Sequence, residues 1–446
     1  MLFATQRPAT IVMTSGTGST GRRAQSCATC LAGPVMSARG TAADPSQGHG
    51  VRSPPVHVGF ALLTLFPGRV GGSESNVRGL LSEFSRGRGP ERMTVLANRH
   101  VAREYAGWAR GGIAIHQVRS YRAGNRDATR LMAMVGAALA PRVVARDVPK
   151  SIDVLHHAVT VPIPKLRGTP TVTTVYDLQH HDLPHLFSRG ERAFRSWAYD
   201  GAARAADLAL TTSEYSRRRL VDVLDIDPTR IEAIPMGIEH DRFQPAPTDA
   251  DERIAPGLPE RFVLYPANLW PHKNHARLIE AFGRVSDREL GLVLTGQTYG
   301  RDGELREAAV RAGVAERVHH LGHVAPDELP ALMRSSQALV FPSLYEGFGS
   351  PPLEAMACGC PVASSRKASL AEMVGDAAVF LDPESADSIA DAIDRVTGDR
   401  KLAAELRERG IRHAGGFTWQ ACAQRHRVAY ERVAETRGPT RGSNSQ

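Results

Sequence analysis

The chain has 446 residues, of which 42% are hydrophobic and 23% are charged, a composition typical of a soluble globular protein with room for two domains. No run of about 18 apolar residues occurs, which excludes a membrane-spanning helix, and five cysteines are too few for a disulfide framework and favour a reducing cytoplasm. Half of the net charge of +8 lies in residues 1–55, and no basic stripe with interleaved aromatics is present, so we expect no nucleic-acid partner.

Residues 1–55 are rich in Ala, Gly, Ser, Thr, Pro and Arg and show no periodicity. We therefore expect a disordered extension, or a start site assigned too far upstream. The first residues also lack the apolar core of a signal peptide. Cys27 and Cys30 form a CxxC pair in this segment. Without a second ligand pair or a βαβ context, the pair does not predict a zinc or redox site.

From Val56 onward, short apolar runs alternate with helical stretches. The first run is followed by a Gly-rich turn, PGRVGGSES, and a helix, NVRGLLSEF. The strands predicted in this half cover residues 56–66, 93–98, 112–118, 151–159, 169–177 and 206–213. Such alternation is typical of βαβ units and a parallel sheet.

A proline-rich stretch at residues 243–260 interrupts the pattern, and we expect a linker with a hinge near 245–260. The alternation then restarts, with strands predicted at residues 261–268, 290–296, 318–324, 338–343, 361–365 and 377–383. The domain organisation predicted in this way consists of an N-terminal domain over 56–245, a C-terminal domain over 246–435 and a polar tail over 436–446. The last helix of the chain is a candidate to cross back to the N-terminal domain.

The most informative stretch is SLYEGFGSPPLEAMACGCP, Ser343 to Pro361. It follows a predicted strand, and we expect a helix to begin near Pro351, because proline is favoured in a first helical turn. The backbone amides expected at the helix entrance are those of Gly347, Phe348, Gly349 and Ser350. Glycine permits close approach of the backbone to a ligand, and the helix dipole attracts phosphate, so the stretch predicts a diphosphate site.

The same stretch contains two glutamates, Glu346 and Glu354. A hydrolytic pair of carboxylates lies roughly 5–9.5 Å apart, whereas eight residues of helix span about 12 Å. We therefore interpret the two carboxylates as separate acceptors for hydroxyl groups on either side of the phosphates.

The E-x7-E pattern, followed by ACGCPV and SLAEMVGDAAVFLDP, resembles the donor-site signature of retaining glycosyltransferases of family 4 (group 1). The resemblance extends from about Val56 to Glu435 and is strongest from Arg261 to Pro383. It implies the α/β GT-B fold, in which two Rossmann-like domains face each other across a cleft. It also implies transfer of a sugar from a GDP- or UDP-sugar to a glycan or lipid-linked acceptor in polysaccharide or glycoconjugate synthesis, with retention and without a metal or cofactor. General likeness to the family favours mannose from GDP-mannose.

For the donor site, the resemblance implies that Glu354 binds the ribose, that Glu346 binds the transferred sugar, and that the amides of Phe348 and Gly349 hold the phosphates. In YPANLWPHKNHARLIEAF, Lys273 takes the position of the family's phosphate-binding lysine. A cation there neutralises the leaving diphosphate.

Other donor-site positions are less regular. Asn268 stands where many members of the family have arginine, and Gly296 ends the strand that follows. Gly71 and Gly72 lie in the turn that resembles the Gly-rich loop after the family's first strand, where their backbone can approach the donor phosphates or the acceptor.

The segment TTVYDLQHHDLPHLF resembles one in which the family often has a His-Asp pair that contacts the donor sugar. This chain has Tyr176 and Asp177 there, and we include both among the catalytic candidates with Glu346 and Lys273. Either Tyr176 keeps the hydrogen bond to the sugar, or His180 or His181 takes it over.

Several further signals have an ordinary structural interpretation beside a functional one. The DxD pattern at Asp225–Asp227 follows a helix end, so we expect a turn and no metal site there. Ser213 is expected to cap a helix. The histidine pairs have two interpretations each, as ligand-facing or as structural groups: His156 with His157, and His272 with His275.

Four arginines precede the apolar stretch LMAMVGAALA: Arg119, Arg122, Arg126 and Arg130. One interpretation is a basic amphipathic surface that contacts an anionic bilayer, which would make the cytoplasmic protein peripheral to the inner face of the plasma membrane. The alternative is a core-facing helix with a solvated basic face.

Two other functions remain open at this point. A sugar-nucleotide epimerase has the same fold, and the unusual Asn268 and Tyr176 also permit a catalytically silent sugar-nucleotide-binding subunit.

Overall fold

The computed structural model describes residues 55–68, 71–109, 112–124, 126–245 and 257–436. The predicted extension before Pro55, with Cys27 and Cys30, therefore lies outside the described residues. So do most of the predicted linker and the tail after Thr436.

Two parallel sheets form the described part of the chain, in the order β3-β2-β1-β4-β5-β6-β7 and β10-β9-β8-β11-β12-β13. The first sheet consists of β1 (His57–Leu62), β2 (Arg92–Ala97), β3 (Ile113–Gln117), β4 (Val154–His157), β5 (Thr171–Thr174), β6 (Leu208–Thr211) and β7 (Ile231–Ala233). The second consists of β8 (Phe262–Pro266), β9 (Gly291–Thr295), β10 (Val318–His320), β11 (Ala338–Phe341), β12 (Val362–Ser365) and β13 (Val379–Leu381). Each strand range predicted from the sequence contains one of these strands, except that β2 begins one residue before the predicted range 93–98. The predicted α/β class with two Rossmann-like units is confirmed.

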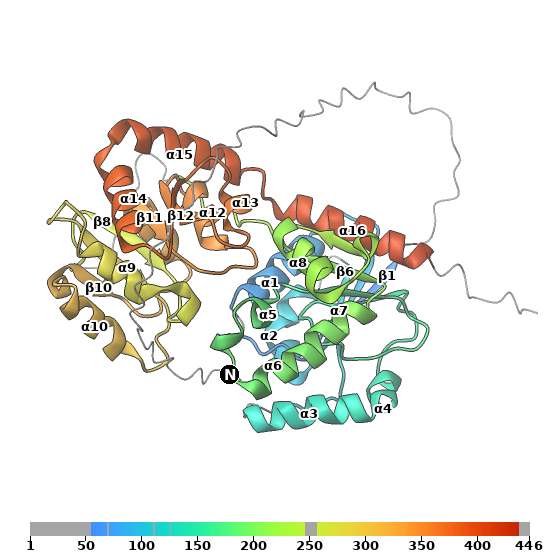
Figure 1. Cartoon of the computed structure of the whole chain (residues 1–446). Coiled ribbons are helices and arrows are strands. Elements are labelled where there is room, and N and C mark those ends of the chain that lie inside the picture. Colours follow the sequence, from blue (N-terminus) through green and yellow to red (C-terminus); the bar gives the residue numbers. More distant parts are fainter. Residues whose placement is uncertain (1–54, 69–70, 110–111, 125, 246–256, 437–446) are drawn as a thin grey trace, which may run out of the picture. The chain divides into compact units, whose positions relative to one another are not determined.

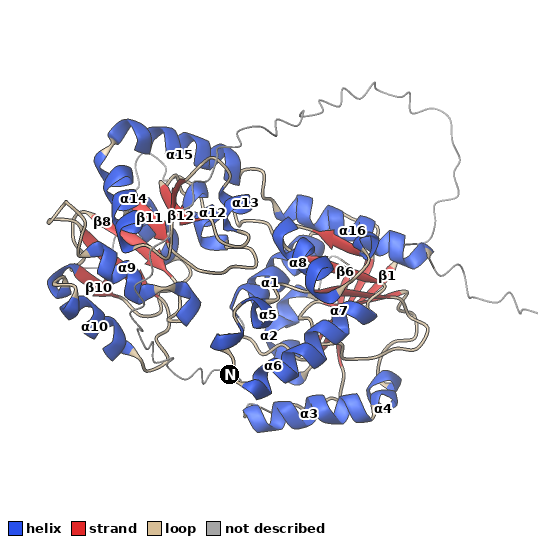
Figure 2. Ribbon diagram, in the orientation of Figure 1, coloured by secondary structure: helices blue, strands red, loops and turns tan. Residues whose placement is uncertain are grey.

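Helices alternate with the strands (Figure 2). Those up to residue 224 are α1 (Gly71–Ser85), α2 (Arg99–Glu104), α3 (Asp127–Leu139), α4 (Pro141–Arg146), α5 (Gln179–Asp182), α6 (Arg189–Arg195), α7 (Gly201–Ala205) and α8 (Glu214–Leu224). The later ones are α9 (His275–Phe282), α10 (Asp302–Arg311), α11 (Glu328–Ser335), α12 (Ser350–Ala357), α13 (Leu370–Val374), α14 (Ala386–Gly398), α15 (Arg400–Ala414) and α16 (Trp419–Glu435). Among the described residues, no helix combines the length and the apolar character needed to cross a bilayer.

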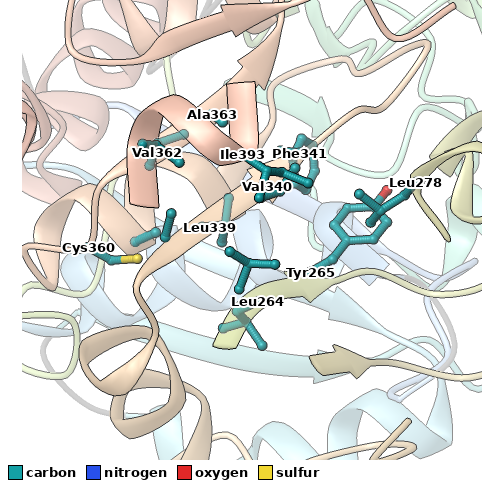
Figure 3. Close-up of a cluster of buried hydrophobic side chains, with 14 of the residues drawn as sticks. Leu264, Tyr265, Leu278, Leu339, Val340, Phe341, Cys360, Val362, Ala363 and Ile393 are labelled. Atoms are coloured by element: carbon teal, nitrogen blue, oxygen red, sulfur yellow. The ribbon is translucent and has the colours of Figure 1, made fainter. Parts of the chain in front are cut away.

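The central strands are buried on both faces, and for this reason their sequences are continuous apolar runs. Every residue of β1, β9 and β11 is buried. Figure 3 shows the core of the second sheet, which includes Leu264 of β8, Phe341 of β11 and Ile393 of α14.

In each sheet, the chain order reverses between two neighbouring strands: β1 and β4 in the first sheet, β8 and β11 in the second. Connections leave such a pair in opposite directions, and this opens a crevice at the carboxyl ends of the strands. The second of these switch points positions the candidate site.

The last helix, α16, packs against α1 and the first sheet (Figure 1). Tyr430 shares a hydrogen bond with His156 of β4 (2.8 Å), and Arg427 Nε lies 2.9 Å from both carboxylate oxygens of Glu91. Helix α16 therefore contributes to the core around the first sheet. The domain bounds given above stay a prediction.

Two sequence predictions in the N-terminal half are wrong in detail. Helix α1 begins at Gly71, so Gly71 and Gly72 belong to its first turn and not to a preceding loop. Glu74 explains the early start, because its carboxylate accepts a hydrogen bond from the Gly68 amide (2.8 Å). The same carboxylate forms an ion pair with Arg78 in the next turn of the helix.

The second correction concerns α3. Its Arg130 is buried, with the guanidinium over the Phe66 ring (4.0 Å), so this arginine is not on a solvated basic face. The exposed face of α3 is apolar instead.

Candidate active site

The loops after β8 and β11 meet at the switch point of the second sheet. Lys273 Nζ lies 2.6 Å from Glu346 Oε1, and the two side chains are only 16% and 12% exposed. Lys273 also lies over the Phe341 ring, with Nζ 5.4 Å from its centroid. The Leu344 amide donates to the His272 carbonyl (2.8 Å), which ties the two loops together. The topology thus joins the cation and the carboxylate that the sequence assigned to one site.

Helix α12 begins at Ser350, one residue before the predicted start. Gly349 precedes it with φ +92°, a conformation that favours glycine. Ser369 Oγ donates to the carbonyls of Glu346 (2.9 Å) and Phe348 (3.0 Å) and so holds the loop in place. The Phe348 ring is buried in the core, which leaves only its backbone for a ligand.

Glu354 lies in α12 and is half-buried. Burial raises the pKa of Glu354 to about 7, with Arg242 acting against the shift and Glu239 adding to it. Glu346 forms an ion pair with Lys273, whereas Lys273 is not among the charges that act on Glu354. The two carboxylates therefore lie in different electrostatic environments.

Tyr176 follows β5 and turns its hydroxyl inward. The hydroxyl donates to the Ala158 carbonyl (2.9 Å) and accepts from Asn76 Nδ2 of α1 (3.1 Å), and burial raises its pKa. Asp177 Oδ1 accepts from the Gln179 amide (3.1 Å) at the start of α5. In this structure Tyr176 therefore positions α1 and the loop after β5.

The Gly347 backbone contacts the loop after β5. A Cβ added to Gly347 would lie 2.5 Å from the Tyr176 carbonyl oxygen, so only glycine fits without a shift of the backbone. The Gly347 carbonyl accepts from Thr212 Oγ1 (3.1 Å) and Ser213 Oγ (2.9 Å) after β6.

A second contact between these regions involves Glu372 of α13. Its carboxylate accepts from the amides of Glu214 (2.8 Å) and Tyr215 (3.0 Å) in the first turn of α8, where a negative charge is stabilising. Thr212 and Glu372 were missed from the sequence. The run TTSEYS signals a helix start, but nothing in it signals what lies opposite.

Asn268 and Gly296 belong to one pair of loops. Asn268 Oδ1 accepts from the Gln297 amide (2.8 Å), so the side chain that replaces the expected arginine holds the loop after β9. Gly296 has φ +122°, and an added Cβ would lie 2.5 Å from the Ala267 carbonyl oxygen. Both residues thus serve the close approach of the loops after β8 and β9.

Comparisons with known proteins identify the family of the chain. The family model for Glycosyl transferases group 1 matches residues 249–413, and that for Glycosyltransferase Family 4 matches residues 70–242. The chain belongs to the family 4, group 1 glycosyltransferases.

Among curated relatives of this glycosyltransferase, O-antigen chain mannosyltransferase B of Escherichia coli is 28% identical over 63% of this chain and 74% of its own length. A D-inositol 3-phosphate glycosyltransferase of Salinispora arenicola is 30% identical over 61% and 65%. An MMP alpha-(1->4)-mannosyltransferase of Mycolicibacterium hassiacum is 29% identical over 52% and 55%. The chain therefore spans between about half and three-quarters of the length of these relatives.

Solved structures share the fold of the glycosyltransferase at low identity. Sucrose-phosphate synthase from Thermosynechococcus elongatus gives a TM-score of 0.65 at 18% identity, over 85% of this chain and 99% of that one. Anabaena Alr3699/HepE in complex with UDP and glucose gives a TM-score of 0.63 at 18% identity, over 84% and 100%.

The two histidine pairs at 156–157 and 272–275 contain three structural histidines and one that lies beside Lys273. His156 and His157 are buried in β4, and His275 is buried with Nε2 3.1 Å from the Ala267 carbonyl. These three are structural. His272 is half-buried beside Lys273, and burial first, then the charge of Lys273, lowers its pKa.

His180 and His181 lie on α5 and bind one carboxylate. Their Nε2 atoms lie 3.0 and 2.8 Å from the two oxygens of Asp200. Burial opposes ionisation of Asp200, but the two hydrogen bonds hold its pKa below the usual value, so both imidazoles donate. The ligand atoms of these three residues lie within 4.8 Å of one another, which makes the group a possible metal-binding set among the described residues.

The predicted turn at Asp225–Asp227 is confirmed. Asp225 ends α8 in the left-handed conformation, and the Asp227 carboxylate accepts from the amide and hydroxyl of Thr229 (2.8 and 2.7 Å). The predicted cap is also confirmed, since Ser213 Oγ accepts from the Ser216 amide (3.1 Å).

Proposed function

We propose that this glycosyltransferase moves mannose from GDP-mannose, with retention, to a hydroxyl of a glycan or lipid-linked acceptor. The observation that carries the proposal is the Lys273–Glu346 pair at the switch point, beside the entrance of α12. Two of the relatives are described as mannosyltransferases, which supports the choice of sugar.

In this proposal, the diphosphate of the donor competes with Glu346 for Lys273. A nucleoside diphosphate carries more negative charge than one carboxylate, so Lys273 turns to the phosphates and stabilises them as they leave. Glu346 is then free to accept hydrogen bonds from sugar hydroxyls, and Glu354 accepts them from the ribose. Amides at the entrance of α12 complete the phosphate site.

The roles of the loop after β5 follow from its contacts. Asp177 stands at the carboxyl end of the strand and is assigned to the sugar or the acceptor. Tyr176 positions this loop through Ala158 and Asn76. His181, whose side chain is 30% exposed, is the member of the α5 histidine pair that a substrate can reach.

We also propose that transfer needs no metal, because Lys273 and a helix N-terminus supply positive charge for the diphosphate. Cys360 and Cys422 form no disulfide, which supports a place in the reducing cytoplasm.

The experiment uses the full chain with radiolabelled GDP-mannose and UDP-sugars, a membrane extract as acceptor source, and EDTA throughout. The expected result is a mannosylated product of retained anomeric configuration, determined by NMR. An inverted product would overturn retention, and a requirement for added metal would overturn metal independence. Tight donor binding with neither transfer nor slow donor hydrolysis would indicate a binding subunit, and a changed sugar on the nucleotide would indicate an epimerase.

A further inference from the structure

Helix α3 has an apolar face that the protein leaves exposed. Met132 is 73% exposed and Leu139 is 82% exposed, and Leu131, Val135 and the neighbouring Val143 of α4 are exposed as well. The α3 positions 131, 132, 135 and 139 follow the helical spacing of one stripe. The opposite face, with Ala137, packs on the core, so the exposed stripe is additional to what folding needs.

Beside α3 lies a basic hollow of about 410 Å³. Three arginines line it, Arg99, Arg119 and Arg122, together with Tyr121 and Thr129. The local field is positive: after burial, the charges of Arg99 and Arg130 lower the pKa of His100. One acid on this side, Asp147, is occupied by the amide and hydroxyl of Ser120 (2.9 and 3.2 Å).

A second hollow, of about 380 Å³, adjoins the first, and the walls of both hollows are mainly apolar. Its lining includes Met132, Ala137, Val143 and Val144, and it shares Tyr121, Arg122 and Thr129 with the basic hollow. The three arginines of the first hollow therefore lie beside an apolar space that continues along the same helix.

Tyr121, which lines both hollows, points to a ligand independently. It is only 4% exposed, and its hydroxyl has no hydrogen-bond partner among the described residues. A buried hydroxyl without a partner costs free energy, and a phosphate oxygen in the basic hollow would satisfy it.

We propose that the two hollows form a binding site for an anionic phospholipid of the bilayer surface. The phosphate head binds Arg99, Arg119, Arg122 and the Tyr121 hydroxyl, and an acyl chain lies in the apolar hollow. The exposed stripe of α3 then enters the interface of the membrane. This site gives a physical basis to the membrane contact expected for a lipid-linked acceptor, but its test needs no transfer activity.

The test is flotation of the full chain with vesicles of phosphatidylcholine, alone or mixed with phosphatidylglycerol. We expect binding to the mixed vesicles only, weakened by salt. Arg119→Glu with Arg122→Glu, and separately Met132→Glu with Leu139→Glu, should each lower binding by at least about ten-fold. Tyr121→Phe, which keeps the ring, should lower it several-fold.

The matched controls are Arg400→Glu and Val310→Glu, which alter an exposed arginine and an exposed apolar residue on α15 and α10. Both should bind vesicles as the unaltered chain does, and all variants should keep the same thermal unfolding and nucleotide binding.

Equal binding to phosphatidylcholine alone, or unchanged binding of the arginine or Tyr121→Phe variants, would overturn the head-group site. Stabilisation by inorganic phosphate as strong as that by vesicles would indicate a free-phosphate site instead. A lipid-free dimer that the Met132→Glu, Leu139→Glu variant dissociates would assign the stripe to a second copy of the chain.

Discussion

Lys273 Nζ and Glu346 Oε1 lie 2.6 Å apart although the two residues are separated by 73 positions in the chain. The parallel pairing of β8 with β11 makes this contact, because it brings together the two loops that follow these strands. Both side chains are largely buried, so removal of one leaves the other with an unpaired charge in a poorly solvated place.

Lys273→Met should therefore lower kcat/KM for transfer by about 10²- to 10³-fold, as expected for loss of a group that stabilises the leaving diphosphate. Steady-state kinetics with labelled donor measure the effect. Lys367→Met is the matched control, since its pair with Glu384 is half-exposed and lies outside the site. A Lys273→Met enzyme with the rate of the control would contradict the assignment.

Gly347→Ala should displace the loop after β11. The added Cβ would lie 2.5 Å from the Tyr176 carbonyl oxygen, a backbone atom that cannot rotate away. We expect a loss of about 10²-fold in transfer rate from misplacement of Glu346, with a decrease of about 1–3 kcal/mol in the free energy of unfolding. Gly303→Ala in α10, where the Cβ meets open space, is the control and should be neutral or stabilising.

Glu354 should make stability depend on pH. Burial raises its pKa from 4.5 to about 7, so between these values the folded chain binds a proton that the unfolded chain has released. The stabilising contribution is complete below pH 4.5 and is lost as the pH rises to about 7. Relative to Glu354→Gln, the free energy of unfolding should fall by about 2–3 kcal/mol across this window, measured by urea denaturation. Parallel curves for the two proteins would contradict the raised pKa.

Nucleotide affinity should change in the opposite direction. If the ionised Glu354 accepts hydrogen bonds from ribose hydroxyls, donor binding favours the deprotonated form, and affinity rises as the pH passes about 7. Calorimetric titration with GDP should show this rise for the unaltered chain and a flat profile for Glu354→Gln. A flat profile for both would remove Glu354 from the ribose site without touching the role of Lys273.

Arg427→Ala tests how α16 is held on the first sheet. Arg427 and Glu91 are 7% and 9% exposed and form two contacts of 2.9 Å, so truncation leaves a buried carboxylate without its partner. The expected loss is about 3–5 kcal/mol of unfolding free energy. Arg432→Ala, in the same helix with a half-exposed pair to Glu232, should cost less than about 1 kcal/mol, and equal costs would contradict the assigned burial.

Much of the fold was readable from the sequence because parallel strands are buried on both faces. Runs such as ALVF before Pro342 have no polar alternation, so they mark strands without knowledge of their neighbours. The start of α12 could also be predicted from the sequence, since the effects of glycine and proline on a helix start extend over only a few residues. The start of α1 was predicted too late. The Glu74 carboxylate stabilises the first turn by accepting a hydrogen bond from the Gly68 amide, six residues earlier, and the sequence pattern gives no sign of this contact.

What the sequence determined by itself was thus the order of strands and helices, the helix-mouth site and the family. Tertiary structure alone decided which loops meet: Lys273 with Glu346, Gly347 with Tyr176, and Glu372 with the first turn of α8. It also turned the Tyr176 hydroxyl inward and left an apolar face on α3 exposed. The physical reason is that propensity and periodicity act over a few residues, whereas these contacts depend on strand order, which places distant segments at the same edge of a sheet.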